Sequence, residues 1–138
     1  MLFPIFFIRE IPVESNPFRR YVGVCGNGQS VRTTLLRVYA VILQTVYNLS
    51  LQEEFKDAID PYYTLIGYHN SIRELGGTVR LLQDDIPKRI QRIQTRSHMS
   101  KRRFLNHRIE ITSRMSSFEI PNKLKQLETE YTDRKSVV

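Results

Sequence analysis

The residues best suited to chemistry in this sequence are cationic and gather between positions 86 and 108. This stretch carries eight lysine and arginine residues and no aspartate or glutamate. Lys88, Arg92 and Arg96 follow one another at steps of four, which places them on one face of a helix. Such a face suits phosphates, whose contacts dominate the affinity of proteins for nucleic acids. The candidate contacts in this basic tract are Lys88, Arg89, Arg92, Arg96, Lys101, Arg102 and Arg103. A solvated surface, or a face paired with acids elsewhere, explains the same charges about equally well.

A glycine-rich segment, Gly23 to Ser30, has the spacing of a phosphate-binding loop between a strand and a helix. Gln29 stands where such a loop has its lysine, and a neutral amide cannot offset the charge of a β- or γ-phosphate. Glycine-rich turns also arise for purely geometric reasons. The segment therefore favours a turn over a nucleotide site, and we expect no ATP hydrolysis by this chain.

Other reactive side chains are few. The three histidines, His69, His98 and His107, lack the carboxylate cluster or the spacing of a metal site. Cys25 has no histidine near it in sequence, and we expect a buried structural cysteine. No metal ligand and no catalytic residue is predicted.

Composition predicts one domain with a polyanionic partner. The chain has 138 residues, of which 41% are hydrophobic and 25% charged, enough to fill one core. The formal net charge of +7 favours nucleic acid as the partner, ahead of an anionic membrane surface. No apolar run approaches the ~20 residues that span a bilayer, and the N-terminus is a poor signal peptide. We expect a cytoplasmic protein without a membrane partner.

Hydrophobic periodicity and turn residues predict alternating strands and helices. We expect strands at 20–25, 62–69 and 108–112. Helices are expected at 29–48 and 72–82, at 86–96 after a break around Pro87, and after a capping box at Ser116 to Glu119. This order favours a parallel α/β sheet with helices on its faces. Residues 1–19 are expected to form an extended arm or linker, and 20–138 the domain.

Five short motifs follow one another along the chain: Phe6 to Pro12, Arg20 to Val24, Gly28 to Ala40, Thr64 to Gly77 and Ile111 to Pro121. Their order and spacing resemble superfamily 2 DEAD/DEAH-type helicases, and among them the DISARM anti-phage helicases. The resemblance covers about residues 5–130. It implies a partial RecA-like three-layer α/β domain, namely the N-terminal part of the second RecA-like domain.

The resemblance also implies residue roles. Thr64 to Ser71 resembles motif IV and Ile111 to Glu119 the next strand-to-helix unit, both facing nucleic acid and the interdomain cleft. It therefore adds candidate nucleic-acid contacts at Tyr68, His69, Asn70, Ser71, Thr112, Ser113 and Arg114. ATP and Mg²⁺ are implied for the longer protein. This chain lacks the P-loop lysine, the acidic Mg²⁺ box, and motifs V and VI with their arginine finger.

We therefore expect a segment of an ATP-dependent helicase or translocase for phage defence or DNA metabolism, inactive alone. Its expected partners are nucleic acid, DNA rather than RNA, the first RecA-like domain and the rest of the second. Two alternatives stay open. One is a non-catalytic basic α/β nucleic-acid-binding module, and the other is a protein-interaction module whose basic face docks on an acidic partner.

Overall fold

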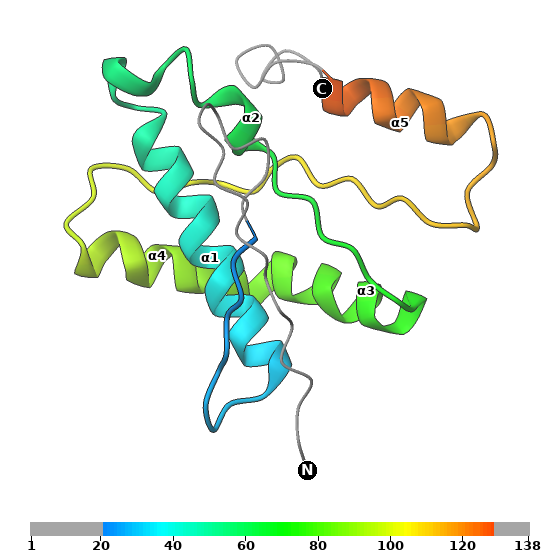
Figure 1. The fold of residues 1–138 in the computed structure, drawn as a ribbon, viewed down its shortest axis with the longest axis horizontal. Coiled ribbons are helices and arrows are strands. Elements are labelled where there is room, and N and C mark those ends of the chain that lie inside the picture. The colour runs from blue at the N-terminus through cyan, green and yellow to red at the C-terminus, as the bar shows by residue number, and fades with distance from the viewer. Residues whose placement is uncertain (1–20, 129–138) are drawn as a thin grey trace.

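A computed structural model describes residues 21–128 of the protein, and its regular structure is helical (Figure 1). The elements are α1 (Val31–Leu49), a 3₁₀ turn η1 (Glu53–Phe55), α2 (Asp60–Tyr63), α3 (Ile72–Arg80), a π-helical turn η2 (Leu81–Asp85), α4 (Ile86–Arg96) and α5 (Glu119–Glu128). Residues 21–128 form no strand, so the predicted parallel-strand α/β RecA-like fold is wrong. The arm or linker predicted at 1–19 lies outside the described residues.

Helix α1 confirms the helix predicted at 29–48. It begins after Ser30, whose side chain accepts a hydrogen bond at 3.2 Å from the backbone N–H of Thr33. This N-cap satisfies one of the donors that a helix start leaves unpaired. The buried face of α1 carries Ala40, Leu43 and Gln44.

Helices α3 and α4 follow one another without the predicted break. Ser71 caps α3 by accepting from the N–H of Glu74 at 3.2 Å. The chain then widens into η2, where the N–H of Ile86 bonds to the carbonyl of Leu81. Pro87 has no N–H to donate, but it stands in the first turn of α4, directly after this wide turn. A proline is tolerated at a first-turn position, so the helix continues past it. Proline and the acids before it therefore mark a wide turn within a helical rod.

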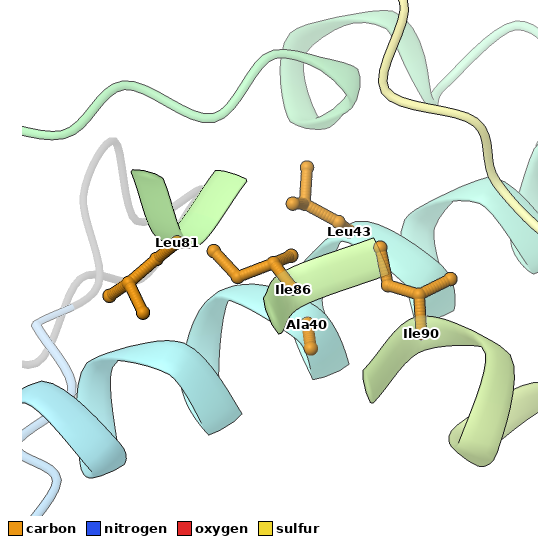
Figure 2. Close-up of a cluster of buried hydrophobic side chains, with 5 residues drawn as sticks. All are labelled: Ala40, Leu43, Leu81, Ile86 and Ile90. Atoms are coloured by element: carbon orange, nitrogen blue, oxygen red, sulfur yellow. The ribbon is translucent and has the colours of Figure 1, made fainter. Parts of the chain in front are cut away.

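The core forms where α1 crosses α4. Ala40 and Leu43 of α1 meet Ile86 and Ile90 of α4 and Leu81 of η2, as Figure 2 shows. Burial of each large apolar side chain contributes about 1.5–3 kcal/mol. The side chains packed around this cluster are Leu36, Tyr39, Leu65, Leu82, Ile93 and Leu105. Two of them, Leu65 and Leu105, bring extended segments against the helix pair.

The three predicted strands are extended or helical instead. Residues 21–25 are exposed and have no regular structure, and Arg20 is outside the described part. Asp60–Tyr63 turns into α2 because Pro61 occupies its first turn, which leaves only residues 64–69 extended. Residues 108–112 are also without regular structure. Aromatic and β-branched residues suit a strand, but a strand also needs a second strand to pair with, and no strand pairing forms within residues 21–128.

Helix α5 lies apart from the α1–α4 core, at the far end of the segment that follows residue 105 (Figure 1). It has no buried residue. The Nζ of Lys123 donates to the carbonyl of Glu110 at 3.0 Å, which ties the helix to the segment before it. Within residues 21–128 no helix combines the length and apolarity needed to cross a bilayer.

Candidate nucleic-acid interface

The open side of α4 carries a shallow basic hollow. It has a volume of about 430 Å³ and is lined by Lys88, Gln91, Arg92, Thr95 and Arg96. We call these five residues the basic face. Its three cations are exposed and have no ion-pair partner among residues 21–128. The helical spacing inferred from the sequence is therefore present, and neutral hydrogen-bonding groups, those of Gln91 and Thr95, lie between the charges.

Arg89 lies beside this face rather than on it. The residue is half-buried, and its Nε is buried without a hydrogen-bond partner in the described part of the chain. It does not line the hollow.

Arg103 is committed to internal contacts. Its guanidinium donates to the carbonyl of Leu43 at 3.3 Å and to that of Tyr63 at 2.9 Å. The guanidinium carbon also lies 4.1 Å from the centre of the Tyr63 ring. Arg103 thus joins α1 to α2, and its charge is directed inward.

Two glutamines hold the segment around Arg103 in place. The amide of Gln44 donates to the carbonyl of Lys101 at 2.9 Å and accepts from the N–H of Arg103 at 3.0 Å. Gln94 donates to the carbonyl of Met99 at 2.7 Å. These side-chain bonds satisfy backbone groups that a neighbouring strand would otherwise satisfy. They explain why residues 101–103 are extended but belong to no sheet.

Arg102 points to the other side of this segment. Successive side chains of an extended backbone alternate in direction, and Arg102 donates from Nη1 to Oε1 of Gln91 at 3.1 Å. Its guanidinium also lies over the ring of Phe104, 4.5 Å from the ring centre.

Sequence reasoning missed Phe104 and Thr95. The signals that could have found them were the i+7 step from Lys88 for Thr95 and the i+2 step from Arg102 for Phe104.

The candidates from the motif IV resemblance lie at the start of α3. Tyr68 is 91% exposed and His69 is half-buried. The N–H of Asn70 donates to a carboxylate oxygen of Glu74 at 3.2 Å, and Ser71 is the N-cap described above. Because α3 and α4 run on along one line in Figure 1, this group lies far from Arg96, at the other end of the rod.

A tyrosine of α1 lies behind this group. A Cβ at Gly67 would lie 2.5 Å from the hydroxyl of Tyr39 and 3.3 Å from Nε2 of His69. Glycine therefore allows this close approach, and burial raises the pKa of the Tyr39 phenol.

The remaining candidates belong to the turn before α5. Thr112 is half-buried and its carbonyl accepts from the N–H of Met115 at 3.1 Å, while Ser113 and Arg114 are exposed. None of them lines the basic hollow. The structure therefore brings together Lys88, Arg92 and Arg96, with Arg102 bonded to Gln91 beside them. The candidates before α3 and in the turn before α5 lie on separate surfaces.

The Gly23 to Ser30 segment does not fit ATP or Mg²⁺. In a phosphate-binding loop the serine hydroxyl would face the metal ion. Here Ser30 Oγ caps α1 and lies 2.9 Å from the hydroxyl of Thr33. A Cβ at Gly26 would meet the side chain of Thr34, so this loop packs against α1. Gln29 supplies no charge in place of lysine to offset that of a bound phosphate.

Other reactive groups are dispersed. Cys25 is exposed, which corrects the expected buried cysteine, and its thiol lies 3.4 Å from Oδ1 of Asn27. Residues 21–128 contain no group of three or more histidine, cysteine, aspartate or glutamate side chains arranged to hold a metal ion.

Comparison with known proteins gives one informative match. No protein-family model and no solved structure matches the chain. The chain is 55% identical over 125 residues to DISARM protein DrmA of Bacillus paralicheniformis. This alignment covers 91% of the chain but only 11% of that protein. The resemblance to a DISARM protein that the ordered motifs indicated is therefore confirmed, and the chain is similar to one segment of a much longer relative.

Proposed function

We propose that the chain is a segment of a DISARM-type anti-phage defence protein and that it contacts nucleic-acid phosphates through the basic face of α4. The similarity to DISARM protein DrmA supports the first part. Alignment of Lys88, Arg92 and Arg96 around one hollow, without acidic partners among residues 21–128, carries the second. Phosphate contacts position a protein on nucleic acid without selecting sequence, so binding is sequence-independent.

ATP-driven translocation on DNA would belong to the longer protein. The longer protein would supply the nucleotide and Mg²⁺ sites, because the loop before α1 does not fit these ligands. The role of this chain is then to hold the nucleic-acid backbone while the chemistry occurs elsewhere. DNA is the expected polymer, since defence against phages acts on incoming genomes.

Salt dependence of DNA binding tests the phosphate contacts. Three neutralised phosphates give a slope of log affinity against log salt of roughly −2 to −3, at about 0.7–0.9 per phosphate. The 138-residue chain is titrated into fluorescent DNA of several sequences at a series of salt concentrations. All sequences should give the same affinity and slope.

A charge-matched pair of variants locates the contacts. Combining Lys88→Gln, Arg92→Gln and Arg96→Gln should remove most binding and flatten the salt dependence. Combining Arg32→Gln, Arg37→Gln and Arg80→Gln removes the same charge from α1 and α3 and should retain binding. Equal losses in both variants would mean that net charge alone attracts DNA. Retention of binding by the first variant would contradict the proposal and favour an acidic protein as the partner.

A further inference from the structure

We infer that Phe104, with Arg102 on one side of its ring, is a base-stacking platform beside the basic face. The site would then take single-stranded nucleic acid in preference to duplex. This inference rests on the proposed phosphate contacts and adds to them a second kind of contact, made by a base.

The platform and the basic face are physically joined. The guanidinium of Arg102 lies 4.5 Å from the centre of the Phe104 ring. The same guanidinium donates at 3.1 Å to Gln91, which lines the basic hollow. The Phe104 ring is thus one side chain away from the hollow in which the phosphates would lie.

The ring is held open to solvent. Phe104 is 65% exposed, although one of its faces carries a guanidinium. On the opposite side of the segment, Leu105 packs on the core and Arg103 bonds into α1 and α2. Gln44 holds the backbone on both sides of Arg102. The alternation that turns Arg103 and Leu105 inward therefore turns Arg102 and Phe104 outward, and the ring cannot fold into the core.

This arrangement suits a flexible strand. Aromatic side chains stack on any base, because every base has a π face, and a cationic guanidinium strengthens such contacts. In a duplex the faces of the bases are already stacked on one another, so a surface ring cannot reach them. Four residues of α4 rise about 6 Å, so the three cations can follow successive phosphates of one strand.

Abasic DNA separates the two kinds of contact. The chain is titrated with oligothymidylate, with an abasic strand of equal length and with a duplex of equal length. Phosphate contacts are available in all three, whereas a free base is available only in the first. We expect oligothymidylate to bind about tenfold more tightly than the abasic strand, the effect of one stacked base.

Variants of Phe104 test whether its ring causes the tighter binding of oligothymidylate. Phe104→Leu should abolish the difference between oligothymidylate and the abasic strand without changing abasic binding, and Phe104→Tyr should retain it. Phe118→Leu is the matched control, because Phe118 is 85% exposed and precedes α5. Because the chain has no tryptophan, quenching of 2-aminopurine fluorescence can report the stack directly.

The outcomes separate the two proposals. If the abasic strand binds and bases add nothing, the platform is wrong and the phosphate contacts stand. Equal affinity for duplex and single strand, or an unchanged base advantage in Phe104→Leu, also overturns the platform. If the wild-type chain does not bind the abasic strand, the proposed phosphate contacts are wrong.

Discussion

At the scale of single residues, Gln44 decides how the basic tract is divided. It is fully buried, and its amide bonds two backbone groups of an extended segment. Arg103 is thereby drawn inward and Arg102 turned outward. Arg103 therefore makes internal contacts whereas Arg102 lies beside the basic face, although both carry the same charge. Counting charges along the sequence cannot distinguish the two arginines.

Gln44→Met keeps the volume of this side chain but removes its two partly buried hydrogen bonds, to the carbonyl of Lys101 and from the N–H of Arg103. Each lost hydrogen bond costs about 0.5–1.5 kcal/mol net, so the free energy of unfolding should fall by roughly 2 kcal/mol. Urea denaturation measures this loss. Gln83→Met at an exposed site of η2 is the control and should change stability by less than about 0.5 kcal/mol. Equal stability of both variants would contradict the role given to Gln44.

Glu119 is a second residue whose environment makes a measurable prediction. Hydrogen bonds from the backbone N–H of Ser116, at 3.1 Å, and then from its hydroxyl, at 3.0 Å, lower the pKa of this carboxyl. A lowered pKa means that the charged form favours the folded cap. This stabilisation is complete above the pKa of the unfolded chain and is lost as pH falls through the lower folded value.

An NMR titration of the Glu119 carboxyl tests this cap. Ser116→Ala removes the hydroxyl and should move the pKa part of the way back toward its ordinary value, because the backbone N–H remains. Ser117→Ala should leave the Glu119 pKa unchanged. A Glu119 pKa insensitive to Ser116→Ala would show that the hydroxyl bond does not form in solution.

At the scale of elements, the turn η2 shows how a helix accommodates proline. In its wide register the N–H of Ile86 bonds to Leu81, and the next donor would be that of Pro87, which has none. The carbonyl of Leu82 is left over, and Nη1 of Arg108 donates to it at 3.3 Å. Arg108, which belongs to the basic tract at 86–108, therefore supplies a donor to a helix carbonyl 26 positions earlier in the chain.

A double-mutant cycle tests this substitution of donors. Arg108→Ala should lower the free energy of unfolding by about 0.5–1 kcal/mol, the net value of one hydrogen bond. In a Pro87→Ala background the new N–H can serve the carbonyl, so the same Arg108→Ala change should cost almost nothing. Thermal or urea denaturation of the four proteins measures the coupling. Additive effects would mean that Arg108 and Pro87 act independently.

Sequence patterns predicted the helices well and the strands badly, for a physical reason. The apolar steps of α1 and the capping residues before α3 and α5 act within a few positions, so they can be recognised locally. Whether Thr64 to His69 becomes a strand depends on a backbone partner elsewhere. Within residues 21–128 the amide of Gln44 bonds the backbone of Lys101 and Arg103, and the Arg103 guanidinium bonds the carbonyl of Tyr63, contacts that no periodicity indicates.

The candidate site was predictable to the same extent. The i, i+4, i+8 spacing placed Lys88, Arg92 and Arg96 correctly, because they belong to one helix. Contacts across the fold set the orientation of Arg102, Arg103 and Arg108, and these were not predictable. The basic face is therefore smaller than the charge of the tract at 86–108 suggested.

At the scale of the whole molecule, stability is concentrated in one helix crossing. The buried cluster comes from α1, η2 and α4, whereas α5 contributes no buried residue. Regions with few buried apolar contacts open locally at low cost, and core elements open only on global unfolding. The basic face is built on the stable part, which keeps its three cations at fixed spacing.

Native-state hydrogen exchange should therefore reveal two levels of protection. Amides in α1 and α4 should exchange slowest and together, and those of α5 should exchange much faster through local opening. Ile90→Ala removes a fully buried side chain and should lower the protection of α1 and α4 by about 2–5 kcal/mol, with α5 nearly unchanged. Leu124→Ala, at a position 47% exposed on α5, should lower the protection of α5 by a smaller amount and leave that of α1 and α4 nearly unchanged. If Ile90→Ala lowered protection of α5 equally, α5 would belong to the same cooperative unit as the core.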